Sequence, residues 1–120
     1  MPKKRFNKKR PFFQHYVIEL FNVDRDLLIK DTSVSNYIKK FIEKLKEKVV
    51  YSTSYNFTPY GATLIFVLRS SHLIVHTWPA SNYLHIDFLT CFNPVQPTIL
   101  SEYIKSLFKI KDFKIKLISY

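Results

Sequence analysis

The residues best suited to chemistry lie close together in the chain, between positions 63 and 91. They are Thr63, Ser71, His72, His76 and Cys91, the last being the only cysteine. Alternation along residues 72–78 predicts a strand that presents both histidines on one face, with Ile74 and Trp78 beside them. Ser71 lies at the start of this strand, so we expect a hydroxyl and an imidazole close to it.

A serine in such surroundings can rearrange its own backbone. Its hydroxyl attacks the preceding carbonyl, a hydrogen-bond donor stabilises the oxyanion, and a base removes the α-proton to expel the ester. The residue left at the new N-terminus becomes a pyruvoyl group, which forms a Schiff base with a substrate amine and serves as electron sink in decarboxylation. Because a Ser–His pair on a strand is more often structural than catalytic, these residues alone leave both interpretations open.

Composition places these residues in a small globular domain. The chain has 120 residues, of which 47% are hydrophobic and 17% aromatic, and this excludes a disordered chain. A single cysteine cannot form an intrachain disulfide, which fits a reducing compartment. The longest apolar run, Leu64–Leu68, is too short to cross a bilayer. We therefore expect a cytoplasmic protein without a membrane partner.

The formal charge of +10 is unevenly distributed. Residues 1–10 hold six basic residues and no acidic one, and we assign residues 1–13 to a basic N-terminal tail. Residues 14–120 are expected to form a single domain. The tail is either a solubilising extension or an arm that contacts RNA or another polyanion. The first role is favoured, because the body of the chain carries only modest positive charge.

Hydrophobic periodicity predicts an α+β domain with the element order β-α-β-β-β-β-α-β. Helices are expected over residues 32–49, capped by Thr32 or Ser33, and in a segment with Pro97 in its first turn. Strands are expected at residues 15–23, 50–57, 62–68, 72–78, 83–91 and 113–118. Two helices cover only one face of a mainly antiparallel sheet, which gives a two-layer sandwich. A second copy is the simplest cover for the other face, so we expect a homodimer.

Three segments, taken in order, resemble the signature of a known family. They are Pro59–Thr63 (PYGAT), Ser70–Pro79 (SSHLIVHTWP) and Asp87–Cys91 (DFLTC). They are similar to the S-adenosylmethionine decarboxylase family in its short prokaryotic, pyruvoyl-dependent type. The resemblance is centred on residues 57–91, and the element order on both sides agrees with it. It implies the two-layer fold, a self-generated pyruvoyl cofactor, a homodimer of cleaved chains, and no metal.

The resemblance also implies a role for each matching residue. Ser71 would become the pyruvoyl group after a cut between Ser70 and Ser71, and it would form the Schiff base with the substrate. Thr63 supplies the hydroxyl that assists processing, and His76 is the base in the elimination. Cys91 is the general acid that returns a proton to the decarboxylated carbon. The remaining match, Phe57, would stack on the adenine of the substrate.

Four positions depart from the family pattern. The family has glutamate where this chain has Ser70, and another where it has Ala80, whose carboxylate would grip the ribose hydroxyls of the substrate. Phe92 replaces a glycine and Ile74 replaces a polar residue. The residues for processing are thus better kept than those for substrate binding.

Three functions are compatible with this pattern. The first is a self-processing S-adenosylmethionine decarboxylase that supplies spermidine biosynthesis. The second is a catalytically inactive homologue that acts as a basic structural or RNA-binding protein. The third is a pyruvoyl-dependent arginine or ornithine decarboxylase, which the missing carboxylate at Ala80 would favour. We rank them in this order, because drift would rarely spare Thr63, Ser71, His76 and Cys91 together.

Overall fold

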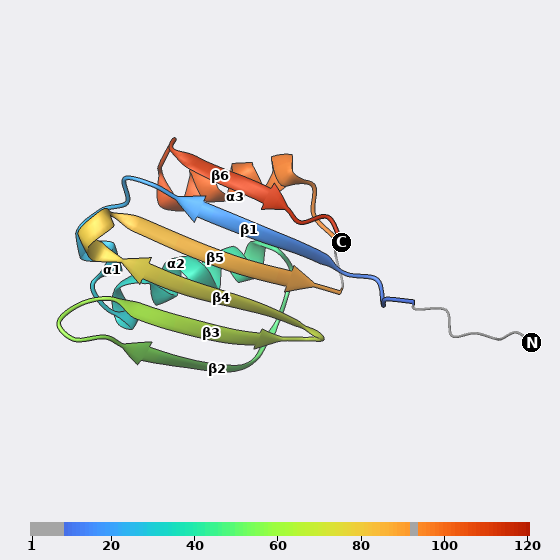
Figure 1. Ribbon diagram of the computed structural model, residues 1–120, viewed down its shortest axis with the longest axis horizontal. Coiled ribbons are helices and arrows are strands. Elements are labelled where there is room, and N and C mark those ends of the chain that lie inside the picture. The colour runs from blue at the N-terminus through green and yellow to red at the C-terminus, as the bar shows by residue number, and fades with distance from the viewer. Residues whose placement is uncertain (1–8, 92–93) are drawn as a thin grey trace, which may run out of the picture.

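Six strands form one antiparallel sheet in the spatial order β2-β3-β4-β5-β1-β6 (Figure 1). The computed structural model describes residues 9–91 and 94–120. The strands are β1 (Gln14–Leu20), β2 (Val49–Asn56), β3 (Ala62–Leu68), β4 (Ser71–Trp78), β5 (Tyr83–Thr90) and β6 (Phe113–Leu117). Strands β2 to β5 follow one another as a meander, whereas β1 lies between β5 and β6.

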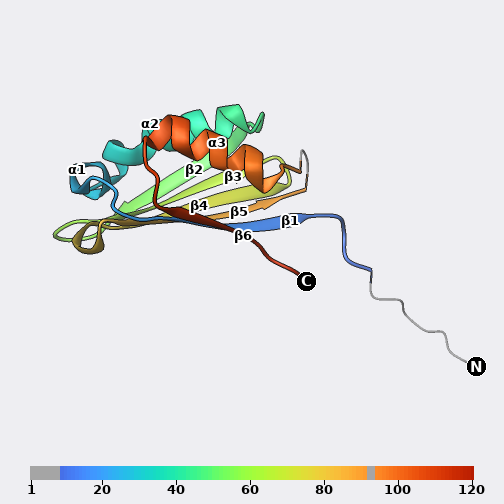
Figure 2. The same ribbon diagram turned by 90° about the horizontal axis from the view of Figure 1, so that it is seen from above.

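The two long helices cover the same face of this sheet, as Figure 2 shows. They are α2 (Asp31–Lys44) and α3 (Pro97–Phe108). Alternate strand residues face these helices and build the core, for example Leu73 and Val75 of β4 and Ile86 of β5, all fully buried. The predicted two-layer α+β sandwich with an antiparallel sheet is therefore confirmed.

Two short elements and one helix end differ from the sequence prediction. The segment between the expected first strand and first helix contains α1 (Arg25–Leu28), and a 3₁₀ turn, η1 (Pro79–Ser81), joins β4 to β5. Helix α2 ends at Lys44 rather than near Val49. The chain leaves the helix because Lys46 adopts a left-handed conformation with φ of 60°.

The start of α2 is also held differently from the prediction. Its N-cap is Lys30, which makes no capping hydrogen bond with its side chain, instead of Thr32 or Ser33. The carboxylate of Asp31 accepts hydrogen bonds from the side chains of Ser54 and Asn56 on β2. These bonds hold the pKa of Asp31 below its usual value. The helix is thus anchored to the edge strand by its first residue.

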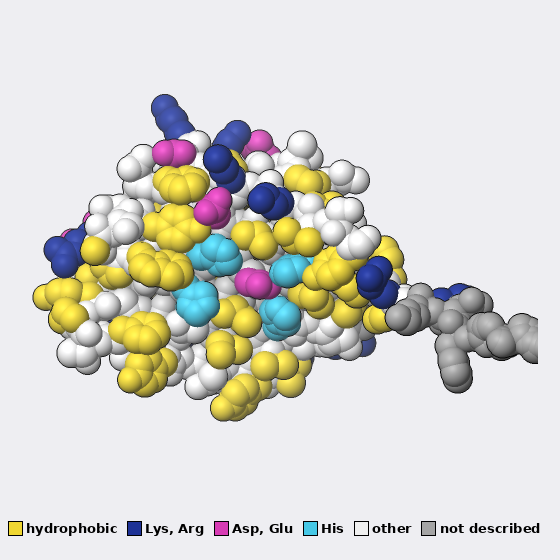
Figure 3. Space-filling view, in the orientation of Figure 1, with side chains coloured by type: hydrophobic (Ala, Val, Ile, Leu, Met, Phe, Trp, Pro, Cys, Tyr) yellow, Lys and Arg dark blue, Asp and Glu magenta, His cyan; other side chains and the backbone are white. Residues whose placement is uncertain are grey.

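Among residues 9–91 and 94–120, no helix covers the other face of the sheet, and we call it the open face. Its side chains are the alternate residues that point away from the core, among them Ile74 of β4 and Val17 of β1. Figure 3 shows that the histidines of the chain gather on this face around an acidic side chain. No helix in the described part of the chain is long and apolar enough to span a membrane.

Helix α1 is fixed to the sheet through the buried hydroxyl of Thr77. This oxygen donates to the carbonyl of Leu28 at 2.8 Å and accepts from the N–H of Ala62 at 2.9 Å. The N–H of Gly61 donates to the carbonyl of Ile29 at 2.8 Å. Three segments distant in sequence therefore meet at one end of β4, and Arg25 is brought there with them.

Replacing this hydroxyl is expected to destabilise the fold. Thr77→Val keeps the shape but leaves a buried N–H and a buried carbonyl without their partner, so we expect a loss of about 2–4 kcal/mol in unfolding free energy. Urea denaturation measures the difference. The matched control is Thr53→Val on the exposed strand β2, which should change stability by less than about 0.5 kcal/mol. Equal effects of the two variants would contradict the proposed anchoring role.

Candidate functional site

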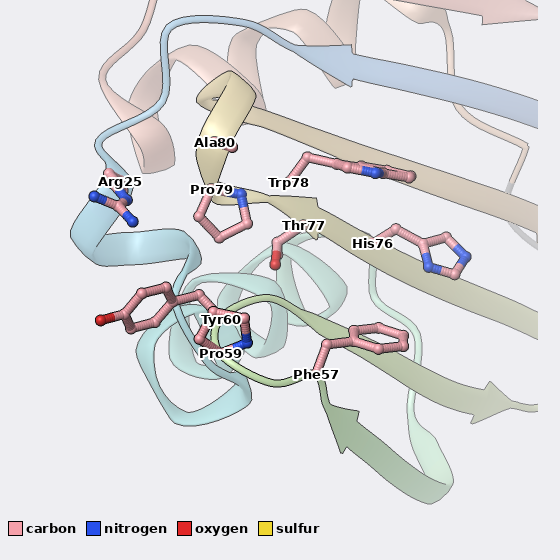
Figure 4. Close-up of a pocket in the computed structure, with 9 residues that line it drawn as sticks. All are labelled: Arg25, Phe57, Pro59, Tyr60, His76, Thr77, Trp78, Pro79 and Ala80. Carbon is pink, nitrogen blue, oxygen red and sulfur yellow. The ribbon is translucent and has the colours of Figure 1, made fainter.

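A pocket of about 540 Å³ lies at the end of β4, beside α1 and the turn between β2 and β3 (Figure 4). It is lined by Arg25, Phe57, Pro59, Tyr60, His76, Thr77, Trp78, Pro79 and Ala80. The rings of Phe57, Tyr60 and Trp78 are about half exposed. Exposed aromatic faces around a cavity suit a flat, largely apolar ligand.

The charge of this pocket comes from Arg25. Its guanidinium lies over the ring of Tyr60, 5.2 Å from the ring centre. Among the described residues that line the pocket, it is the one permanently charged group. Ala80 also lines the pocket, so no carboxylate is present at the position where the family has glutamate. The pocket therefore lacks an anionic acceptor for ligand hydroxyls.

A hydroxyl–imidazole pair lies next to this pocket. Thr63 and His76 are opposite each other on β3 and β4, and Thr63 Oγ1 is 2.8 Å from His76 Nδ1. The imidazole also lies near the indole of Trp78, with 5.7 Å between ring centres. The hydrogen bond orients the imidazole on the open face, where it can exchange a proton with a neighbouring group.

Ser71 lies at the opposite end of β4 and is buried on the helix side, with 7% of its surface exposed. Its Oγ accepts a hydrogen bond of 3.0 Å from the backbone N–H of Cys91. The thiol of Cys91 belongs to a half-buried residue. The structure thus joins Ser71 and Cys91, and separately joins Thr63 and His76.

Within one chain, the structure does not place Thr63 or His76 near Ser71. No hydrogen bond in the described residues links Ser71 to Thr63 or His76. His76 lies five positions after Ser71 along the strand, or about 16 Å at the usual rise per residue. Their odd separation also puts them on opposite faces of the sheet, as the burial pattern of β4 confirms. The alternation of side chains along a strand already predicts that Ser71 and His76 lie on opposite faces.

The residue before Ser71 has an unusual backbone conformation. Leu68 and Ser71 are paired, so Arg69 and Ser70 form a two-residue turn between β3 and β4. Ser70 has φ of 56°, in the left-handed region, which costs about 1–2 kcal/mol for a residue other than glycine. The expected cleavage site is therefore a strained peptide directly ahead of a buried, oriented hydroxyl.

Sequence reasoning missed several residues of this region. Arg25 was not singled out because it precedes the motifs, and α1 brings it to the pocket only in the fold. Asp87 was part of a motif without a role, although strand alternation already placed it on the open face with the histidines. The substituted position Phe92 lies outside the described residues, as do residues 1–8 of the basic tail.

Comparison with known proteins identifies the family. A family profile described as S-adenosylmethionine decarboxylase matches residues 14–119. The S-adenosylmethionine decarboxylase proenzyme of Thermotoga maritima is 34% identical over 98 residues, which cover 82% of this chain and 75% of that protein. The proenzyme 2 of Bacillus cereus is 31% identical over 105 residues, covering 88% and 85%.

A solved structure agrees at the level of the fold. The adenosylmethionine decarboxylase of Aquifex aeolicus superposes with a TM-score of 0.77, covering 92% of this chain and 91% of that one at 24% identity. The family profile matches most of this chain, and each of the two sequence relatives aligns over most of this chain and most of its own length. This chain therefore belongs to the S-adenosylmethionine decarboxylase family.

Proposed function

We propose that this chain cuts itself between Ser70 and Ser71 and then decarboxylates S-adenosylmethionine for spermidine biosynthesis. Members of the family depend on a pyruvoyl group that self-cleavage generates. The observation that carries the proposal is the hydroxyl of Ser71, which accepts a hydrogen bond from the N–H of Cys91 and directly follows the left-handed backbone of Ser70. Ser71 therefore fits the position from which that group would be made.

The cut is an intramolecular rearrangement of Ser71. Its Oγ attacks the carbonyl carbon of Ser70, and the amide becomes an ester with a free amine on residue 71. Removal of the α-proton of residue 71 expels Ser70 as a carboxylate that keeps Oγ. The remaining enamine takes up water and releases ammonia. Relief of the left-handed conformation at Ser70 favours the first step, because the new chain end is free to relax.

The base for this reaction is proposed to come from a second copy of the chain. His76 and Thr63 lie on the open face, about 16 Å along β4 from Ser71, so they cannot act on Ser71 of the same chain without a large rearrangement. Two copies that pair their open faces, with their β4 strands antiparallel, would bring His76 of the partner subunit to the end of β4 that begins with Ser71. A homodimer would then be needed for chemistry as well as for burial of the face.

The pocket of one subunit is proposed to hold the substrate, with its adenine on the exposed ring of Phe57 and its amine toward the pyruvoyl group of the second copy, because Ser71 of the same chain lies at the opposite end of β4. When formed, the pyruvoyl group supplies an electrophilic carbonyl and an electron sink for loss of carbon dioxide. Cys91, whose backbone already contacts Ser71, is proposed to return the proton as general acid. Trp78 and Pro79 line the same pocket.

The missing carboxylate at Ala80 predicts weak binding of S-adenosylmethionine. Ala80→Glu should tighten binding by about 1.5–3 kcal/mol, because a charged acceptor for the ribose hydroxyls is restored. Calorimetric titration with S-adenosylmethionine measures the change. Ala80→Gln is the matched control, since a neutral amide of similar size should recover only about half as much. Equal affinity of all three proteins would contradict this reading of the pocket.

Intact mass and carbon dioxide release test the proposed function together. The purified protein should contain two chains, residues 1–70 and 71–120, and should release labelled carbon dioxide from carboxyl-labelled S-adenosylmethionine. Arginine and ornithine are run in parallel, because turnover of either one would favour the alternative decarboxylase. The comparisons support neither that alternative nor an RNA-binding role. A single chain of 14.4 kDa would overturn both enzymatic proposals.

A further inference from the structure

We propose that Asp87 is a positioning residue that clamps the new chain end after self-cleavage. Its carboxylate Oδ1 lies 3.3 Å from Nε2 of His72 and 3.0 Å from Nε2 of His15. The other ring nitrogen of His15, Nδ1, is 2.7 Å from the hydroxyl of Tyr120. One carboxylate thus joins two imidazoles, and a tyrosine at the chain terminus extends the network.

The three central residues come from neighbouring strands of the open face. His72 of β4 and His15 of β1 both pair with Leu89 of β5, and Asp87 lies two residues before Leu89 on the same face of β5. The side chains of His15, His72 and Asp87 are 20%, 39% and 33% exposed. This partial shielding from water makes the hydrogen bonds to a charged acceptor stronger than those of a fully exposed pair.

The clamp gains its importance from the proposed cut, on which this inference rests. Before cleavage, the turn Arg69–Ser70 holds the first residues of β4 in place. After cleavage, β4 begins at a free chain end, and chain ends fray unless something ties them down. Residue 71 also loses its Oγ in the elimination, and with it the hydrogen bond from Cys91.

His72 is then the first residue of the new chain that keeps a side-chain anchor. The pyruvoyl group would be joined through its amide carbonyl to the backbone nitrogen of His72, so the position of this residue would set the position of the reactive keto group next to that amide. His15 belongs to the chain 1–70, whereas Asp87 and His72 belong to 71–120. Asp87 therefore ties the new end to both cleaved chains, and a displacement of about 1 Å at the reactive group can cost about 100-fold in rate.

The test compares Asp87→Ala in cleaved and uncleaved protein. Asp87→Ala should cut itself to completion, as intact mass measures, and should then show a kcat that is about 10- to 100-fold lower with KM within about 3-fold. Amide hydrogen exchange at residues 72–75 should be at least about 10-fold faster than in the unmodified cleaved protein. In the uncut Ser71→Ala background, the same Asp87→Ala change should leave this exchange nearly unaltered.

A pair of variants at His72 separates the hydrogen bond from general packing. His72→Gln places an amide N–H₂ near the position of Nε2 and should retain most of the kcat. His72→Leu fills similar space without a donor and should match Asp87→Ala. Glu102→Gln, an exposed carboxylate on α3, is the matched control for loss of negative charge and should leave both kcat and exchange unchanged.

Each outcome bears on the clamp separately from the proposed function. Normal cleavage with an unchanged kcat in Asp87→Ala overturns the clamp alone. Equally faster exchange in cut and uncut protein, or failure of Asp87→Ala to fold, assigns Asp87 to folding and also overturns it. An unmodified protein that stays as one chain overturns the proposed function, and it also overturns the clamp, which requires the cut.

Discussion

Ser71→Ala is expected to remain a single chain of 14.4 kDa, whereas the unmodified protein separates into residues 1–70 and 71–120. A methyl group cannot attack the carbonyl carbon of Ser70, so no ester forms and no peptide bond is broken. Intact-mass measurement after prolonged incubation gives the result directly. The effect is expected to be complete rather than partial, because no other step can replace the attack.

Ser70→Ala and Ser70→Gly are the controls for this prediction. Ser70→Ala keeps the cut, since the hydroxyl of Ser70 has no part in the rearrangement. Ser70→Gly should slow it, because glycine adopts positive φ without strain and the cut then relieves about 1 kcal/mol less. Cleavage that persists in Ser71→Ala, or a new chain that begins at Ser70, would show that the assigned cleavage site is wrong.

His76→Ala is expected to accumulate uncut or ester-stalled protein, with a rate of cleavage reduced by about 100-fold or more for loss of the base. Co-expression with Ser71→Ala should restore cutting of the His76→Ala chain. In the mixed dimer, one site combines the intact Ser71 of one chain with the intact His76 of the other, while the second site lacks both. Mass spectrometry distinguishes the two chains and their fragments.

The outcome of co-expression decides between a shared and a single-chain site. If His76 acts on Ser71 of its own chain, neither variant can supply the residue that the other lacks, and no cleavage appears. His15→Ala, which changes another histidine of the open face, is the control for loss of an imidazole there and should still cut. Normal processing by His76→Ala alone would remove this residue from the mechanism.

Local sequence patterns determined most of the fold. Alternating apolar residues placed the strands within one residue of their observed bounds, except that β1 ends at Leu20 and not at residue 23. The agreement is close because a strand with one buried face has a strict period of two. Helical spacing likewise located α2 and α3. The end of α2 was placed too late, since the left-handed conformation of Lys46 is set by the connection to β2 and leaves no mark in apolar periodicity.

Residue types and spacing also identified the candidate chemistry. The pairing of Thr63 with His76 follows from two adjacent antiparallel strands in fixed register, and the structure contains it at 2.8 Å. The contact between Cys91 and Ser71 depends on where β5 ends beside the start of β4, and it runs through a backbone N–H. Side-chain patterns cannot reveal a contact of that kind.

Only the tertiary structure decided how these groups are divided in space. It put Ser71 and His76 at opposite ends of β4 and on opposite faces, which sequence proximity had concealed. It brought Arg25 to the pocket through hydrogen bonds between α1 and the strand ends, and it assembled His15, His72 and Asp87 from three strands. Such sites depend on pairing between segments far apart in the chain, so their geometry is a property of the packed sheet and not of any local motif.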